Sequence, residues 1–174
     1  MKEDNYSWWY KRIKQSFKQF DIVRIDHFRG FEAYWSVPST EKTAINGKWI
    51  KGPGIDLFKS IKKALGDIPV IAEDLGVITE EVSQLRDTCG FPGMKVLQFA
   101  FSNDEIKQNG MTNYFLPHMY TTNECVAYTG THDNDTLQGW LENCNDELLV
   151  MVAEYVERKK ITLEKAKAGV KSGI

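Results

Sequence analysis

The stretch IPVIAEDLGVITEEVSQLRDTCG, residues 68–90, carries the pattern that decides the fold. It starts with a continuous apolar run over 68–72, which is typical of a strand buried on both faces, and turns polar at Glu73. Thr79 is then placed to cap a helix that closes at Gly90. This order of strand, loop and helix predicts one unit of a parallel sheet built by right-handed crossovers.

The same order recurs on both sides of this stretch. Further strands are predicted over residues 21–26, 95–101 and 125–129. Helices are predicted over 6–20 and 56–65, after Asn145, and from Leu163 to before Gly169. Strands that alternate with helices predict an α/β fold. A closed eight-stranded barrel takes about 250 residues, so the alternatives are a small open sheet or part of a barrel.

Residues 31–54, FEAYWSVPSTEKTAINGKWIKGPG, are rich in aromatic residues, glycine and proline. The pattern is too irregular for a helix, and the segment is too long for a simple turn. Its glycines match neither common phosphate-binding pattern, G-x-x-x-x-G-K-S/T or G-x-G-x-x-G. We therefore expect a long, shaped loop with a functional role.

Composition excludes several classes of protein. The chain has 174 residues, of which 42% are hydrophobic and 26% charged, which is enough to bury an ordinary core. Its formal net charge of -2 gives nucleic acids and anionic membranes little attraction, and no apolar run approaches the roughly 18 residues that span a bilayer. Cys89, Cys125 and Cys144 are odd in number and widely spaced, which indicates neither a disulfide framework nor a zinc site. We expect a cytoplasmic protein whose partner is neither nucleic acid nor membrane.

Carboxylates follow three of the predicted strands, at Asp26, at Glu73, and at Asp133 with Asp135. The carboxyl ends of parallel strands share one rim, where α/β proteins bind their ligands. These side chains are therefore candidates for one site. A strand-end Asp is also a common turn residue, so a structural role stays open for each.

Two of these carboxylates suit complementary roles. Arg24 and Asp26 are two residues apart on a strand and face the same way, so the guanidinium favours an ionised carboxylate, as a nucleophile requires. A structural ion pair is the alternative. Glu73 follows an apolar run, which suits a general acid, although Asp74 competes for that role. If the strands are neighbours, about 4.8 Å apart, their carboxylates can approach the ~5 Å separation of retaining glycosidases.

His132 and Asp133 permit three interpretations: a pair of metal ligands, a base with its orienting carboxylate, or a hydrogen-bonding clamp beside a third carboxylate. The other histidines, His27 and His118, do not lie at ligand spacing from His132, so we expect no metal. A nucleophilic serine is not indicated either, because G-x-S-x-G is missing.

Five longer motifs occur in order along residues 21–140: RIDHFRGFEAYW, GKWIKGPG, VIAEDLGVIT, GFPGMKVLQFAF and YTGTHDNDT. Together they resemble the central part of the 4-alpha-glucanotransferases, also called amylomaltases or disproportionating enzymes, of glycoside hydrolase family 77. The resemblance implies an α/β fold that forms a partial (β/α)8 TIM barrel, approximately strands four to seven with their helices. Residues 1–174 would then be a single segment of that barrel, incomplete at both ends.

The resemblance also implies roles for individual residues. Asp26 is similar to the family's nucleophile, Glu73 to its acid/base, and Asp133, rather than Asp135, to its transition-state-stabilising carboxylate. Arg24 and His132 match positions that hydrogen-bond the sugar in the cleavage subsite. No metal and no organic cofactor are implied.

The implied function is a retaining 4-alpha-glucanotransferase. Such an enzyme moves α-1,4-glucan segments between maltooligosaccharides, or starch- and glycogen-type glucans, through a covalent glycosyl-aspartate intermediate. The family's N-terminal half and last strand have no counterpart here, so we expect a fragment with weak or no activity alone, whose open barrel edges invite self-association. The alternatives are a non-catalytic glucan-binding module and an amylase-like α-glucan hydrolase.

Overall fold

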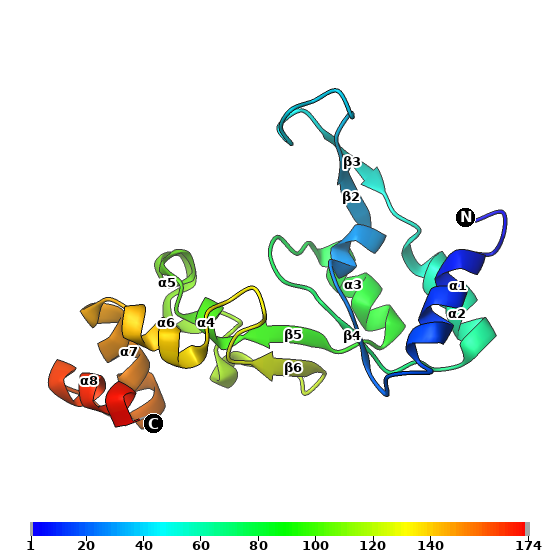
Figure 1. Cartoon of the computed structure of the whole chain (residues 1–174). Coiled ribbons are helices and arrows are strands. Elements are labelled where there is room, and N and C mark those ends of the chain that lie inside the picture. The colour runs from blue at the N-terminus through cyan, green and yellow to red at the C-terminus, as the bar shows by residue number, and fades with distance from the viewer. Residues whose placement is uncertain (1, 173–174) are drawn as a thin grey trace. The chain divides into compact units, whose positions relative to one another are not determined.

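The computed structural model describes residues 2–172 as a mixture of helices and short strands, which confirms the predicted α/β class (Figure 1). The chain divides into two compact units. The first unit comprises the residues up to Met94 together with Glu124–Val126. The second unit comprises Lys95–Asn123 and the residues from Ala127 onward. Over the described range, no helix has the length and apolar character needed to cross a membrane.

The first unit follows the predicted order of strands and helices. Its elements are α1 (Ser7–Ser16), β1 (Val23–Ile25), the 3-10 turn η1 (Phe28–Phe31), β2 (Ala33–Ser36), β3 (Lys48–Lys51), α2 (Gly54–Leu65), β4 (Val70–Ala72) and α3 (Glu80–Cys89). β1 and β4 pair in parallel, with Val23 opposite Val70 and Ile25 opposite Ala72. The prediction of parallel strands is therefore confirmed for this pair, although each strand is shorter than its predicted range.

The core of the first unit is a cluster of buried apolar side chains from α1, α2, α3 and β4. Phe28 is fully buried and contacts the rings of Phe31, Phe58 and Phe91 at centroid distances of 5.5–6.2 Å. Such tilted and edge-on ring contacts are the favourable arrangements for aromatic pairs. The turn that follows β1 is consequently anchored in the core by Phe28.

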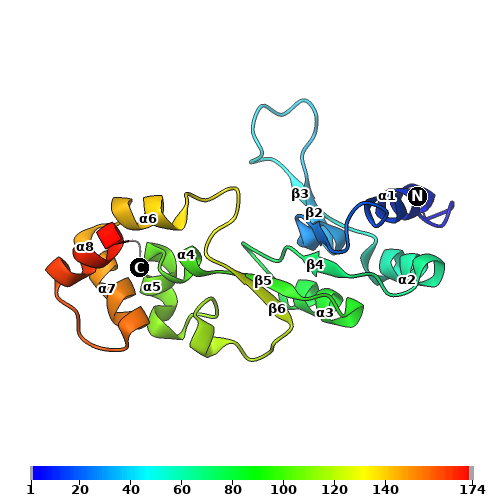
Figure 2. The ribbon, with the colours of Figure 1, turned by 60° about the horizontal axis from the view of Figure 1, so that its bottom comes forward.

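The segment predicted as a loop over 31–54 contains an antiparallel hairpin, so the prediction of a loop throughout was wrong. β2 and β3 pair with Trp35 opposite Trp49, and residues 37–47 connect them. Cross-strand aromatic pairs stabilise hairpins, but their register cannot be seen in a sequence pattern interrupted by eleven connecting residues. Within the first unit this connection projects away from α1, α2 and α3 (Figures 1 and 2).

β5 (Gly93–Val96) and β6 (Cys125–Tyr128) form a third pair, and residues of both strands occur in both units. Two backbone hydrogen bonds connect the segments: the Gly93 N–H donates to the Glu124 carbonyl, and the Gln98 N–H donates to the Thr129 carbonyl. The residue numbers increase together in both segments, as in parallel pairing. The strand predicted over 95–101 was wrong beyond Val96. A short helix, α4 (Leu97–Ala100), follows Val96. At its end the Phe101 N–H donates to the Gln98 carbonyl.

The second unit is mainly helical (Figure 2). After α4 it contains α5 (Asn103–Asn109), η2 (Gly110–Thr112), η3 (Pro117–Met119), α6 (Leu137–Asn143), α7 (Asp146–Glu157) and α8 (Leu163–Ser172). The predicted cap at Asn145 is confirmed, because its side chain accepts from the Leu148 N–H at 2.8 Å. α6 was missed, although Thr136 is a typical capping residue, and α8 continues past Gly169 rather than ending before it.

The described strands form three separate pairs rather than one continuous sheet. Within the first unit, a backbone hydrogen bond extends from β4 toward β5: the Ala72 N–H donates to the Pro92 carbonyl at 2.9 Å. β4 thus has β1 on one side and the segment leading into β5 on the other.

Candidate active site

Asp26 and Glu73 lie side by side at the carboxyl ends of β1 and β4. Ile25 is opposite Ala72 in the parallel pair, and Asp26 and Glu73 are the next residues along each strand. The Glu73 N–H donates to the Ile25 carbonyl at 2.9 Å, and the Phe28 N–H donates to the Glu73 carbonyl at 3.0 Å. The backbone pairing therefore continues past the strand ends and holds the two carboxylate-bearing residues next to each other.

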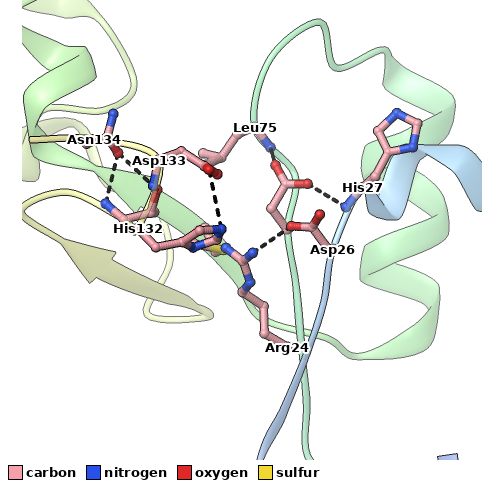
Figure 3. A network of polar contacts seen from close by, with 10 residues as sticks. Arg24, Asp26, His27, Leu75, His132, Asp133 and Asn134 are labelled. Carbon is pink, nitrogen blue, oxygen red and sulfur yellow. Dashed lines mark hydrogen bonds and ion pairs between the residues drawn. The ribbon is translucent and has the colours of Figure 1, made fainter.

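Asp26 is held by Arg24 and remains open to solvent (Figure 3). Arg24 Nη2 donates to Asp26 Oδ1 at 2.6 Å, and the Asp26 side chain is 74% exposed. Arg24 is itself mostly buried, with Nη1 lying 3.9 Å from the sulfur of Met94. A charge-assisted hydrogen bond of this kind fixes one carboxylate oxygen in place. The second oxygen stays available to a ligand.

Glu73 is oriented by backbone groups. Its Oε2 accepts from the His27 N–H at 2.6 Å, and its Oε1 accepts from the Leu75 N–H at 2.9 Å. His27 adopts a left-handed backbone conformation, with φ 48° and ψ 51°, which is uncommon for a residue other than glycine. Sequence reasoning considered His27 only as a metal ligand and missed this backbone contact, for which a single sequence carries no signal.

Asp74, the competitor of Glu73 in the sequence, points into the protein. It is 6% exposed, forms an ion pair with Arg86 and accepts from the Met94 N–H at 2.7 Å. Burial acts to lower the pKa of Arg86, but hydrogen bonds to Asp87 and Asp74 outweigh it and raise that pKa. Asp74 is therefore bound to Arg86 and to the Met94 N–H inside the protein. Of the adjacent residues Glu73 and Asp74, it is Glu73 that lies beside Asp26.

The turn after β6 presents His132 and Asp133 in the second unit (Figure 3). His132 Nε2 lies 3.3 Å from Asp133 Oδ1, and both side chains are more than 70% exposed. Asn134 closes the turn, since its Oδ1 accepts from the Thr131 N–H at 2.8 Å and from the Thr131 hydroxyl at 3.0 Å. The two exposed side chains are thus carried on a turn with its own hydrogen bonds.

Asp135 serves this turn and the start of α6. Its Oδ1 accepts from the Thr136 N–H at 2.8 Å, and its carbonyl accepts from Gln98 Nε2 at 3.0 Å. A Cβ at position 139 would meet the Asp135 carboxylate at 2.6 Å, so Gly139 is needed for this packing. Asp135 is therefore tied to the start of α6, whereas the Asp133 side chain lies beside His132.

The predicted site residues thus fall into two groups. Arg24, Asp26 and Glu73 come together in the first unit, and His132 and Asp133 come together in the second. Among residues 2–172, no group of three or more His, Cys, Asp or Glu side chains is arranged to hold a metal ion. The first group can supply a carboxylate held by Arg24 and a second, backbone-oriented carboxyl group, which is the pair that displacement at a sugar carbon requires.

Comparison with known proteins gives a consistent result. The family model for glycoside hydrolase family 77, described as 4-alpha-glucanotransferase, matches residues 1–172. A 4-alpha-glucanotransferase of Clostridium butyricum is 59% identical over 142 residues, covering 82% of this chain and 28% of that protein. One from Streptococcus pneumoniae TIGR4 is 49% identical over 161 residues, covering 92% and 30%.

A solved structure is similar as well. The amylomaltase from Streptococcus agalactiae in complex with acarbose matches with a TM-score of 0.80 and 39% sequence identity, covering 97% of this chain and 33% of that chain. This chain therefore spans a third or less of the length of these relatives.

Proposed function

Because the chain belongs to the 4-alpha-glucanotransferase family, glycoside hydrolase family 77, we propose that it carries the catalytic carboxylates of a retaining 4-alpha-glucanotransferase. The observation that carries this proposal is the position of Asp26 beside Glu73 at the ends of two paired parallel strands. Two neighbouring carboxyl groups are the arrangement of retaining glycosidases. The substrates are maltooligosaccharides and starch- or glycogen-type α-1,4-glucans, in line with the names of the relatives.

In the first step, the free oxygen of Asp26 attacks the anomeric carbon of the donor sugar. The glycosidic bond breaks, and Glu73 gives its proton to the leaving oxygen, which departs as a sugar hydroxyl. Arg24 orients the nucleophile through the 2.6 Å contact to its other oxygen. The product is a glycosyl ester of Asp26.

In the second step, Glu73 removes the proton from a hydroxyl of the acceptor glucan. That oxygen attacks the anomeric carbon and displaces Asp26, so two inversions give net retention. The His27 and Leu75 N–H groups keep the Glu73 carboxyl group in one orientation through both steps. Every proton and bond is handled by side chains of the chain and by the two sugars, so the reaction uses no cofactor.

For Asp133 and His132, which lie in the second unit, we propose two further roles on the basis of the family resemblance. Asp133 stabilises the positive charge that develops on the sugar ring, and His132 donates hydrogen bonds to ring hydroxyls. Their exposure on a hydrogen-bonded turn supports this role.

We further propose that the fold is a segment of a (β/α)8 barrel, strands four to seven, which the TM-score of 0.80 supports. A cytoplasmic location is supported by Cys89 and Cys144, neither of which forms a disulfide.

The direct test incubates the purified chain with maltotriose and separates the products by chromatography. A ladder of glucose and longer maltodextrins that disappears in Asp26→Asn and Glu73→Gln supports the proposal. Because the chain spans a third or less of its relatives, we expect this activity to be weak or absent in the 174-residue chain alone. A second experiment therefore places the segment in a complete enzyme.

In that experiment, this chain replaces the corresponding segment of the Clostridium butyricum relative. The chimera should disproportionate maltotriose, and Glu73→Gln should lower its rate by about 100-fold or more. Asp87→Asn is the matched control, because Asp87 is an exposed acidic residue of the first unit. Full activity of the Asp26→Asn chimera would overturn the proposal. Steady release of glucose without longer products would favour a hydrolase, and binding without any turnover would favour a glucan-binding module.

A further inference from the structure

Trp35 and Trp49 form an exposed aromatic pair on the hairpin of the first unit. The two residues are directly opposite in the β2–β3 register, with ring centroids 5.4 Å apart at an interplanar angle of 65°. Trp35 is 41% exposed and Trp49 is 53% exposed. Aromatic surface left in water is unfavourable, and a contiguous exposed patch often marks a binding site. This tryptophan pair has no part in the catalytic steps proposed above.

Both rings are held in place by contacts. Trp35 Nε1 donates to the Ala44 carbonyl at 2.8 Å, and the Arg29 guanidinium lies 4.3 Å from the centroid of Trp49. Arg29 also donates to the Val77 carbonyl, so it links the hairpin to the loop after β4. Rings that are already fixed lose little conformational freedom when a ligand binds, which favours affinity.

We propose that the tryptophan pair is an additional binding surface for α-1,4-glucan, outside the catalytic subsite. This inference rests on the proposed function for the identity of the ligand. The C–H groups on one face of a glucose ring are apolar and carry partial positive charge, so they pack against the negative face of an aromatic ring. Lys51 lies two residues after Trp49 on the same face of β3, forms an ion pair with Glu32 at 2.9 Å, and offers an exposed ammonium group to sugar hydroxyls.

A sugar fits this surface better than a protein does. A stable protein interface buries about 800 Å² on each partner, much more than two half-exposed indole rings offer. A glucan needs only one or two ring contacts of this kind, and its length lets several weak contacts act together.

The tryptophan pair is also tied to the loops that carry the proposed catalytic carboxylates. Arg29 follows Asp26 by three residues and Val77 follows Glu73 by four, so these pairs of Cα atoms are at most about 11 and 14 Å apart. Arg29 therefore joins three segments: the turn after β1, the loop after β4 and the hairpin. A glucan long enough to reach from the carboxylates to the hairpin gains a second contact, whereas a short one does not.

The test measures binding without turnover. The chain carrying Asp26→Asn, labelled with ¹⁵N at its indole groups, is titrated with maltoheptaose, and each of the five tryptophan Nε1–H resonances is followed. The resonances of Trp35 and Trp49 should shift, while that of Trp8, which is exposed on α1, should not. Trp35→Ala and Trp49→Ala should each raise the Kd for maltoheptaose at least about fivefold, since each removes one stacking face.

Trp8→Ala is the matched control, because it removes an indole of similar exposure elsewhere in the first unit and should leave the Kd unchanged. Trp49→Phe keeps an aromatic face and should recover part of the affinity even if the alanine variant disturbs the hairpin. Stationary Trp35 and Trp49 resonances, or a Trp49→Phe chain that binds as weakly as Trp49→Ala, would overturn the inference. If the chimera turns over maltotriose but the Trp35 and Trp49 resonances of the Asp26→Asn chain do not shift, the tryptophan pair is rejected as a binding surface and the proposed function stands. If those resonances shift but the chimera shows no turnover, the proposed function is rejected and the binding surface stands.

Discussion

At the scale of single residues, Glu73 and Asp74 show how neighbours in the sequence acquire different environments. Successive side chains of an extended strand point to opposite faces. Glu73 meets the N–H groups of His27 and Leu75 beside Asp26, whereas Asp74 turns inward to Arg86 and the Met94 N–H. Two adjacent carboxylates can therefore be separated into a candidate site residue and a structural residue by the directions in which the segment after β4 points them.

The structural role of Asp74 leads to a prediction about stability. Asp74→Ala leaves the Arg86 guanidinium with one partner fewer and the Met94 N–H with no carboxylate, so the free energy of unfolding should fall by about 2–4 kcal/mol. Urea denaturation followed by circular dichroism measures the loss. Asp87→Asn, at an exposed acceptor of the same arginine, should cost less than about 1 kcal/mol. Equal losses of unfolding free energy in the two variants would contradict the prediction, because they would show that the buried contacts of Asp74 stabilise the fold no more than the exposed contact of Asp87 does.

Cys89 gives a prediction about reactivity and pH. Burial raises the pKa of the Cys89 thiol to about 11 from 9.0 in the unshifted group. At pH 8 the thiolate fraction falls about 100-fold, so iodoacetamide should modify Cys89 about 100-fold more slowly in the folded chain than in urea. Mass spectrometry of quenched samples measures the rates. Similar rates in both conditions would contradict the burial of this thiol.

The sign of the same shift sets its effect on stability. The folded state holds the Cys89 proton more tightly than the unfolded state, so the contribution to stability is complete below pH 9 and is lost as pH rises toward about 11. Cys89→Ser removes this titrating thiol. The alkaline loss of stability in that range should therefore be smaller in the variant than in the parent chain.

At the scale of elements, a local capping signal can place a helix start without forming the cap hydrogen bond, since Thr79 occupies the N-cap of α3 with no side-chain bond to the helix. Strand ends depend instead on partners. Asn145 caps α7 as its sequence position indicates. The apolar run over 95–101 looks like one strand, but its pairing with β6 stops and the chain turns into α4 after Val96. A cap acts within three residues, while a strand persists only where a second segment continues beside it.

The cap of α7 can be tested directly. Asn145→Ala removes the acceptor of the Leu148 N–H and should lower the free energy of unfolding by about 1 kcal/mol. Asn145→Ser supplies another capping oxygen and should recover most of that loss. Thermal unfolding measured by circular dichroism compares the two variants. A serine variant as unstable as the alanine variant would mean that the side chain contributes through packing instead.

At the scale of the whole molecule, each unit has its own apolar core. The cluster of the first unit is built around Phe28, Leu57 and Ile61. Buried apolar residues of the second unit include Phe101, Leu116 and Leu149. The first unit also has an uncovered flank, because Phe20 and Ile22, next to β1, are 61% and 60% exposed.

This flank predicts self-association. Over residues 2–172, β1 has β4 as its strand partner, so its other edge can pair with a second copy whose Ile22 is equally exposed. The sedimentation coefficient should therefore rise with protein concentration, and Ile22→Lys should abolish that rise. Ile45→Lys is the control, because Ile45 is 80% exposed but lies in the hairpin connection. Unchanged association of Ile22→Lys would exclude the β1 edge as the interface.

The sequence by itself determined the α/β class, the order of the main strands and helices, and, through its motifs, the family. These depend on burial periodicity and capping within a few residues, and on motifs that can be compared directly. Tertiary structure decided which carboxylates meet and which do not. Glu73 lies beside Asp26 because β1 pairs with β4, and the contact between His27 and Glu73 spans 46 residues of sequence. Asp74 is buried where it forms an ion pair with Arg86. Trp35 meets Trp49 through the register of the hairpin. Each of these outcomes is a contact between segments distant in the chain, and the free energy of such contacts is not contained in any local pattern.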